Sequence, residues 1–210
     1  MYSQVLIAGF GGQGVLTCGQ VLALAATLEG RHVTWMPSYG PEQRGGTASC
    51  VVTISDRRIG SPLVENLSTA LVFNNPSLVK FEPQLSEGGL LILNSSMVKT
   101  DPARCDLIVH RVPADEIAAE EGMRRASNIV MLGACLAARS VVSLEAALEA
   151  IVKYLGPAKQ HLVEVNRDAL VAGWNFVAGI TSALPVWSPF AVAPASYHEG
   201  LRAELSVAVQ

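Results

Sequence analysis

The residues with the clearest chemical meaning form a glycine turn, Gly9 to Gly14 (GFGGQG), which directly follows a short apolar run. Gly9, Gly11 and Gly14 occupy the positions of a GxGxxG pattern, and Gly12 is an additional glycine between them. In this pattern the first glycine allows a tight turn, the second lets the backbone approach a ligand, and the third lets the next helix pack closely. Backbone N–H groups at the helix start can then bind an anion. The pattern therefore predicts an anion-binding turn of Rossmann type.

A second polar segment, Pro37 to Gly46 (PSYGPEQRGG), is rich in proline and glycine, which is typical of a loop. It follows the carboxyl end of a predicted strand, where ligands of open α/β sheets bind. Arg44 can hold a carboxylate or phosphate through two parallel hydrogen bonds. Alternatively, Glu42 and Arg44 pair with each other and the final glycines only begin a hairpin. The candidate ligand-binding residues of this loop are Tyr39, Gly40, Glu42, Gln43, Arg44, Gly45 and Gly46.

The end of the second predicted strand lacks a feature that dinucleotide-binding proteins use. In those proteins an acidic side chain at this point binds the ribose hydroxyls. Here the strand ends at Trp35 and Met36, followed by Pro37 and Ser38, and neither an acidic residue nor an arginine stands directly after it. The sequence therefore disfavours a nicotinamide dinucleotide as the ligand.

Nucleophiles and metal-binding side chains are dispersed along the chain. Cys18, Cys50, Cys105 and Cys135 show no CxxC spacing, so each is predicted to behave as a small apolar residue. The four histidines share no helical spacing, and the GxSxG nucleophile pattern is absent. We therefore predict no catalytic residue and no metal ligand in this chain alone.

Strands that alternate with helices must position the two polar segments. After the apolar run, strands are predicted at His32–Met36, Thr47–Ser55, Ala70–Asn74, Leu90–Asn94 and Asp106–Val112. Helices are predicted at Val15–Leu28, Pro76–Leu85, Pro113–Glu121, Asn128–Arg139, Leu144–Leu155 and Gln160–Ala178. This order predicts an α/β fold with a Rossmann-like, mostly parallel sheet and helices on both faces. A loop and hairpin are inserted after the second strand, and the C-terminal part is helical.

The predicted domain covers residues 1–180, and Thr181–Gln210 is predicted to be an extended, apolar, proline-containing tail that contacts another subunit. The uncharged stretch Phe176–Tyr197 is interrupted by Pro185, Pro189 and Pro194, which disfavours a membrane span. No targeting segment precedes the first strand, so a cytoplasmic location is expected.

Composition narrows the class of protein further. Half of the 210 residues are hydrophobic and only 16% are charged, which favours a well-filled core with some surface buried against other chains. A formal net charge of −3 without a lysine or arginine cluster disfavours nucleic-acid binding.

Five segments in register resemble one protein family, the gamma subunits of 2-oxoacid:ferredoxin oxidoreductases, and most closely the separate gamma chains of the 2-oxoglutarate and branched-chain enzymes. The similarity extends over most of the chain, from about Gln4 to Gly173. The segments are GFGGQGV (Gly9–Val15), PSYGPEQRGG (Pro37–Gly46), IGSPLV (Ile59–Val64), NPSLVKFEP (Asn75–Pro83) and GGLLILNSS (Gly88–Ser96).

This resemblance implies a multi-subunit enzyme that oxidatively decarboxylates a 2-oxoacid, forms acyl-coenzyme A and passes electrons to ferredoxin. It implies alpha, beta and delta-type partner subunits that hold thiamine diphosphate, magnesium and iron–sulfur clusters. The gamma chain would bind none of these alone. It would pack on the alpha chain and shape the approach of substrate and coenzyme A, with the glycine turn and Arg44 as candidates for binding an anionic group.

Two other functions remain open at this point. One is a stand-alone Rossmann-type nucleotide-binding oxidoreductase. The other is a purely structural scaffold subunit in which both loops serve only subunit contact. An indolepyruvate enzyme with a similar gamma-like domain leaves the 2-oxoacid undetermined.

Overall fold

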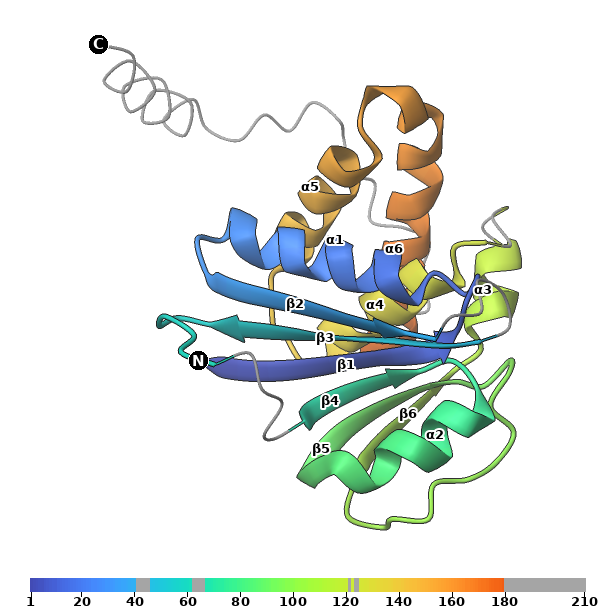
Figure 1. The fold of residues 1–210 in the computed structure, drawn as a ribbon. Helices are drawn as coiled ribbons and strands as arrows, with labels where there is room; N and C mark the ends of the chain where they lie inside the picture. Colours follow the sequence, from blue (N-terminus) through green and yellow to red (C-terminus); the bar gives the residue numbers. More distant parts are fainter. Residues whose placement is uncertain (41–45, 62–66, 121, 123–124, 180–210) are drawn as a thin grey trace.

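The computed structural model describes residues 1–40, 46–61, 67–120, 122 and 125–179. In this part of the chain one six-stranded sheet has the order β2-β3-β1-β4-β5-β6 (Figure 1). β1 pairs in parallel with β4, β4 with β5, and β5 with β6, whereas β3 runs antiparallel to both β1 and β2. The strands are β1 (Tyr2–Phe10), β2 (His32–Tyr39), β3 (Thr47–Ser55), β4 (Leu67–Val72), β5 (Leu85–Asn94) and β6 (Ile108–Val112).

Helices cover the two faces of this sheet unequally (Figure 1). One face carries α1 (Val15–Leu28), α3 (Ala114–Glu120), α4 (Ser127–Ala138), α5 (Leu144–Leu155) and α6 (Val163–Ala178). On the opposite face lies α2 (Asn75–Phe81), followed by the short 3-10 helix η1 (Glu82–Gln84). A second 3-10 helix, η2 (Pro157–Leu162), joins α5 to α6.

The central strand β1 is buried on both faces because helices lie above and below it. Val5 and Ile7 contact the larger apolar cluster, beneath α1 and α4, whereas Leu6 and Ala8 contact the smaller one, beneath α2. A strand that is buried on both faces has a continuous run of apolar residues instead of alternating apolar and polar ones. The sequence of β1 has such a run. The end of β1 is thereby fixed, and with it the start of the glycine turn.

Helices α4 and α6 cross at two glycines. A Cβ atom on Gly133 would lie 1.9 Å from the carbonyl oxygen of Leu170, and one on Gly173 would lie 1.9 Å from that of Val130. Each glycine therefore lets the backbone of the other helix approach more closely than any side chain would allow. This crossing holds the C-terminal helices against the core.

The predicted fold class is confirmed, with two differences in detail. β1 and β2, the strands on either side of α1 in the sequence, are not neighbours in the sheet. β3, which belongs to the predicted hairpin, lies between them. The second strand extends to Tyr39, so part of the predicted loop Pro37–Gly46 is strand; Pro37 is tolerated because β2 is an edge strand. Residues 180–210, and with them the predicted tail and domain boundary, lie outside the described part.

Candidate functional site

The glycine turn connects the end of β1 to the start of α1 and leaves the helix without a side-chain cap. Gly14 is the N-cap residue, with φ of +73°, and among the described residues no side chain caps the first turn of the helix. Gly12 has φ of +98°. Both angles lie in the region that favours glycine. The first amides of α1 therefore remain available to an anion.

Close packing explains two further glycine positions. A Cβ on Gly9 would lie 2.6 Å from Gln13 Oε1 and 2.9 Å from the Cβ of Phe73. A Cβ on Gly14 would lie 2.6 Å from Asn128 Nδ2, whose amide donates a hydrogen bond of 3.1 Å to the Gly14 carbonyl. The turn is thus enclosed on its inner side by Gln13, β4 and the start of α4.

Gln13 fills the crevice between the carboxyl ends of β1 and β4. Its Oε1 accepts the backbone N–H of Phe10 at 2.7 Å and the amide of Asn74 at 3.4 Å, and its Nε2 donates to the carbonyl of Phe73 at 3.3 Å. These parallel strands lead to helices on opposite faces, which defines the point where open α/β sheets bind dinucleotides. A protein side chain occupies that crevice here, in agreement with the missing acidic residue after the second strand.

The open side of the turn faces the β2–β3 hairpin instead. A hollow of about 780 Å³ lies between the turn and the hairpin. Gly11 N–H donates to the Gly46 carbonyl at 2.9 Å, which ties the two segments together. The side chain of Tyr39 is 70% exposed at this hollow. The lining residues are Phe10, Gly11, Gly12, Gly14, Val15, Leu16, Thr17, Tyr39, Gly40, Gly46, Thr47 and Ala48.

The structure brings together the ends of the two segments singled out in the sequence. Of the predicted site residues, Gly11, Gly12, Gly14, Tyr39, Gly40 and Gly46 line this turn hollow, whereas Gly9 is buried behind it. Glu42, Gln43, Arg44 and Gly45 lie outside the described residues. None of the residues known to line the hollow carries a charge. An anion would therefore meet only backbone amides there unless the loop that follows Gly40 supplies a cation.

Two positioning residues of the turn were missed by sequence reasoning. Gln13 was visible as the polar residue inside the glycine pattern, but its partners Phe73 and Asn74 are about sixty positions away. Asn128 contacts the turn across a separation of 114 positions. No spacing in the sequence could have linked these residues to the turn.

Three of the four cysteines are buried in the larger apolar cluster. Burial raises the pKa of the Cys50 and Cys135 thiols to about 12, and that of Cys18 well above its usual value. Such thiols stay protonated near neutral pH and are poor metal ligands and nucleophiles. Within the described ranges, no three histidine, cysteine, aspartate or glutamate side chains are placed to hold a metal ion. The same ranges contain no helix with the length and apolar character needed to cross a membrane.

Replacing Gln13 by alanine is expected to lower the free energy of unfolding by about 1–3 kcal/mol. The substitution leaves the Phe10 N–H and the Phe73 carbonyl without their side-chain partner. Urea denaturation measures the loss, and hydrogen exchange at the Phe10 amide should become faster. As a control, Gln84→Ala removes one exposed hydrogen bond to the Lys80 carbonyl and should change stability by less than about 0.5 kcal/mol. Equal losses in the two variants would contradict the role given to Gln13.

A family model and two curated proteins are similar to this chain over most of its length. A family model described as pyruvate ferredoxin/flavodoxin oxidoreductase matches residues 4–176. The chain is 42% identical over 170 residues to the ketoisovalerate oxidoreductase subunit VorA of Methanothermobacter marburgensis, over 81% of this chain and 35% of that protein. It is 37% identical over 184 residues to the 2-oxoglutarate synthase subunit KorC of the same organism, over 84% of this chain and 97% of KorC.

Two solved structures share the fold. The gamma subunit of a keto/oxoacid ferredoxin oxidoreductase from Geobacter sulfurreducens matches with a TM-score of 0.72 and 31% identity, over 84% of this chain and 99% of that one. A 2-oxoglutarate:ferredoxin oxidoreductase from Magnetococcus marinus, with 2-oxoglutarate, coenzyme A and succinyl-CoA bound, matches with a TM-score of 0.77 over 91% of this chain and 33% of that one. Its identity is 21%, so this second match shows the fold alone. The chain spans about a third of the length of VorA and nearly all of KorC.

Proposed function

The chain belongs to the pyruvate ferredoxin/flavodoxin oxidoreductase family as a gamma-type subunit, and from this premise we propose that it serves a complex that converts a 2-oxoacid to its acyl-coenzyme A. In this proposal alpha, beta and delta-type subunits complete the enzyme, and ferredoxin receives the electrons. The observation that carries it is the match to KorC, because it covers nearly the whole of both chains. The relatives' names leave 2-oxoglutarate, ketoisovalerate and pyruvate as candidate substrates.

We further propose that the turn hollow receives an anionic part of coenzyme A. Three features support this: the uncapped start of α1, the glycines that keep the backbone accessible, and the position of the hollow at the carboxyl end of β1. The loop that follows Gly40 carries Arg44, whose guanidinium would neutralise a phosphate or carboxylate. Tyr39, Glu42 and Gln43 would order the loop or contact the alpha-type chain.

Thiamine diphosphate, magnesium and the iron–sulfur clusters are assigned by this proposal to the partner subunits. Cys18, Cys50 and Cys135 lie in one apolar cluster, but burial raises their pKa and keeps them protonated, whereas cluster ligands are thiolates. Cys105 is exposed, so the cysteines of this chain do not fit a cluster site. The role left to the gamma-type chain is to bind and orient one substrate.

The assembled enzyme tests the proposed activity. Co-expression with alpha, beta and delta-type chains should give a complex that reduces ferredoxin only when a 2-oxoacid and coenzyme A are both present. Comparing 2-oxoglutarate, ketoisovalerate and pyruvate as substrates would identify the 2-oxoacid. A complex that forms but reduces ferredoxin with none of them would contradict the proposal.

Arg44→Ala should raise the KM for coenzyme A or for the 2-oxoacid by about tenfold or more while leaving assembly unchanged. Loss of a charge-assisted hydrogen bond to an anion accounts for about 1.5–3 kcal/mol. Steady-state kinetics of the assembled complex measure both constants, and Arg44→Lys should restore only part of the loss because lysine lacks the planar fork. Unchanged KM values for both substrates would assign the loop to subunit contact alone.

The competing stand-alone dinucleotide enzyme finds no support in the geometry of the turn. Gln13 occupies the space between the ends of β1 and β4, and the second strand ends without an acidic residue to bind the ribose hydroxyls. Titration of the chain with NADH and NADPH should therefore show no saturable binding.

A further inference from the structure

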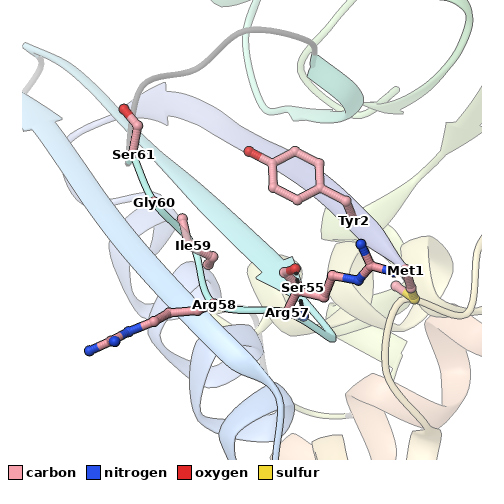
Figure 2. A pocket seen from close by; sticks show the side chains of 8 residues that line it. All are labelled: Met1, Tyr2, Ser55, Arg57, Arg58, Ile59, Gly60 and Ser61. Carbon is pink, nitrogen blue, oxygen red and sulfur yellow. Dashed lines mark hydrogen bonds between the residues drawn. The ribbon is translucent and has the colours of Figure 1, made fainter.

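A second hollow lies at the opposite end of the sheet from the glycine turn. It has a volume of about 620 Å³ and is lined by Met1, Tyr2, Ser55, Arg57, Arg58, Ile59, Gly60 and Ser61 (Figure 2). Because β3 runs antiparallel to β1, Ser55 at the end of β3 lies opposite Tyr2 at the start of β1. The length of β1, about 26 Å at 3.3 Å per residue, separates this basal hollow from the turn hollow.

The basal hollow carries two arginines that no carboxylate of the described residues neutralises. Arg57 and Arg58 are exposed, and neither guanidinium has a hydrogen bond or an ion pair within the described part of the chain. The neighbouring carboxylates Glu29 and Asp56 both pair with Arg31, at 3.1 and 3.7 Å. Two consecutive arginines without a partner among the described residues therefore flank the hollow, on a chain whose net charge is −3.

Apolar side chains accompany these arginines. Tyr2 is 55% exposed and Met1 is 48% exposed, and Ile59 lies across the hollow on the segment that leads to Ser61 (Figure 2). Figure 2 shows Arg57 extending toward Met1 beneath the ring of Tyr2, whereas Arg58 points away from the hollow. Tyrosine, methionine and arginine are the residue types enriched in protein–protein interfaces, and tyrosine and arginine dominate their binding energy.

We propose that the basal hollow is the docking site for an acidic segment of the alpha-type partner subunit, an inference that rests on the proposed function. The occupant would place a carboxylate on Arg57 and an apolar side chain against Tyr2 and Ile59, with Arg58 adding positive charge at the outer rim of the hollow. Charge complementarity identifies it, since free guanidiniums favour bidentate carboxylate partners. Docking at this end leaves the turn hollow, at the other end of β1, open to its ligand.

The experiment compares assembly of the complex for wild type, Arg57→Glu/Arg58→Glu and Lys153→Glu/Lys159→Glu. The lysine pair lies on α5 and η2, is exposed, and gives the same change in charge away from the hollow. Sedimentation analysis with the alpha-containing subcomplex gives each Kd at low and high salt. The arginine variant should bind at least about tenfold more weakly and lose most of the salt dependence, whereas the lysine variant should bind like wild type. Circular dichroism checks that every variant is folded, and Tyr2→Ser, which keeps the charges, should also weaken binding.

The outcomes separate this inference from the proposed function. Assembly of wild type and the arginine variant with equal affinity would overturn the docking site and leave the proposed function standing. Equal weakening by the arginine and lysine pairs would overturn it too, because only net charge would then matter. Self-association of the chain that the arginine variant abolishes would assign the hollow to a second copy instead. Failure of wild type to assemble with any such partner would overturn both proposals.

Discussion

Replacing Gly133 by alanine is expected to lower the free energy of unfolding by at least about 3 kcal/mol. The added Cβ would lie 1.9 Å from the carbonyl oxygen of Leu170, whereas such atoms normally stay about 3.3 Å or more apart. Helices α4 and α6 would therefore have to separate by more than about 1 Å, which loosens the packing around them. The better helix propensity of alanine returns only about 1 kcal/mol. Denaturant unfolding of the purified chain measures the difference.

Matched substitutions separate the helix crossing from the effect of a methyl group alone. Gly173→Ala should be about as destabilising, because its Cβ would meet the Val130 carbonyl at the same 1.9 Å. Gly60→Ala adds a methyl group where nothing lies within 4 Å and should change stability by less than about 0.5 kcal/mol. A Gly133→Ala variant as stable as wild type would show that α4 and α6 do not cross this closely in solution.

Gly14→Ala is expected to lower the free energy of unfolding by about 3 kcal/mol and to reduce coenzyme A-dependent turnover of the assembled complex by more than about tenfold. Two effects combine. A non-glycine residue at φ of +73° costs about 1–2 kcal/mol. In addition, the new Cβ would lie 2.6 Å from Nδ2 and 3.1 Å from the Cβ of Asn128, so rotation of that side chain alone cannot relieve the contact. The start of α1 would move and its amides would no longer face the turn hollow.

Gly30→Ala provides the control for Gly14→Ala, because Gly30 also has φ of +73° but has nothing within 4 Å of its Cβ position. The excess loss at Gly14 therefore measures the contact with Asn128. In an Asn128→Ala background the loss caused by Gly14→Ala should be smaller than in wild type. Strict additivity of the two substitutions would contradict the proposed packing of α4 on the turn.

Both predictions concern glycines, yet only one of them could be anticipated from the sequence. Gly14 belongs to a recognisable pattern whose last glycine is required for close helix packing. Gly133 sits in an apolar helical stripe with Met131, Leu132 and Cys135, and nothing in that stripe indicates that another backbone lies against it. Its role follows from Gly173, forty positions later, and becomes visible only when α4 and α6 are packed.

Local signals were sufficient for the class of fold and for the glycine turn. Apolar runs alternating with helical patterns predicted the sheet and the helices on both faces, because such periodicity reflects which side of each element is buried. The in-register motifs also led to the correct family. Strand order was harder to predict: β3 inserts antiparallel between β1 and β2, a choice that depends on pairing between distant segments rather than on local propensity.

By itself the sequence predicted a glycine turn suited to an anion, a neighbouring loop that carries Arg44, and cysteines without the spacing of a cluster site. The tertiary structure decided which side of the turn is open. Gln13 and Asn128 close its inner side through residues about sixty and 114 positions away, so the open amides face the β2–β3 hairpin instead of the dinucleotide crevice. The same antiparallel β3 returns the chain to the start of β1, where Arg57, Arg58 and Tyr2 line one hollow. Both arrangements arise from contacts between segments far apart in the chain, which local patterns do not record.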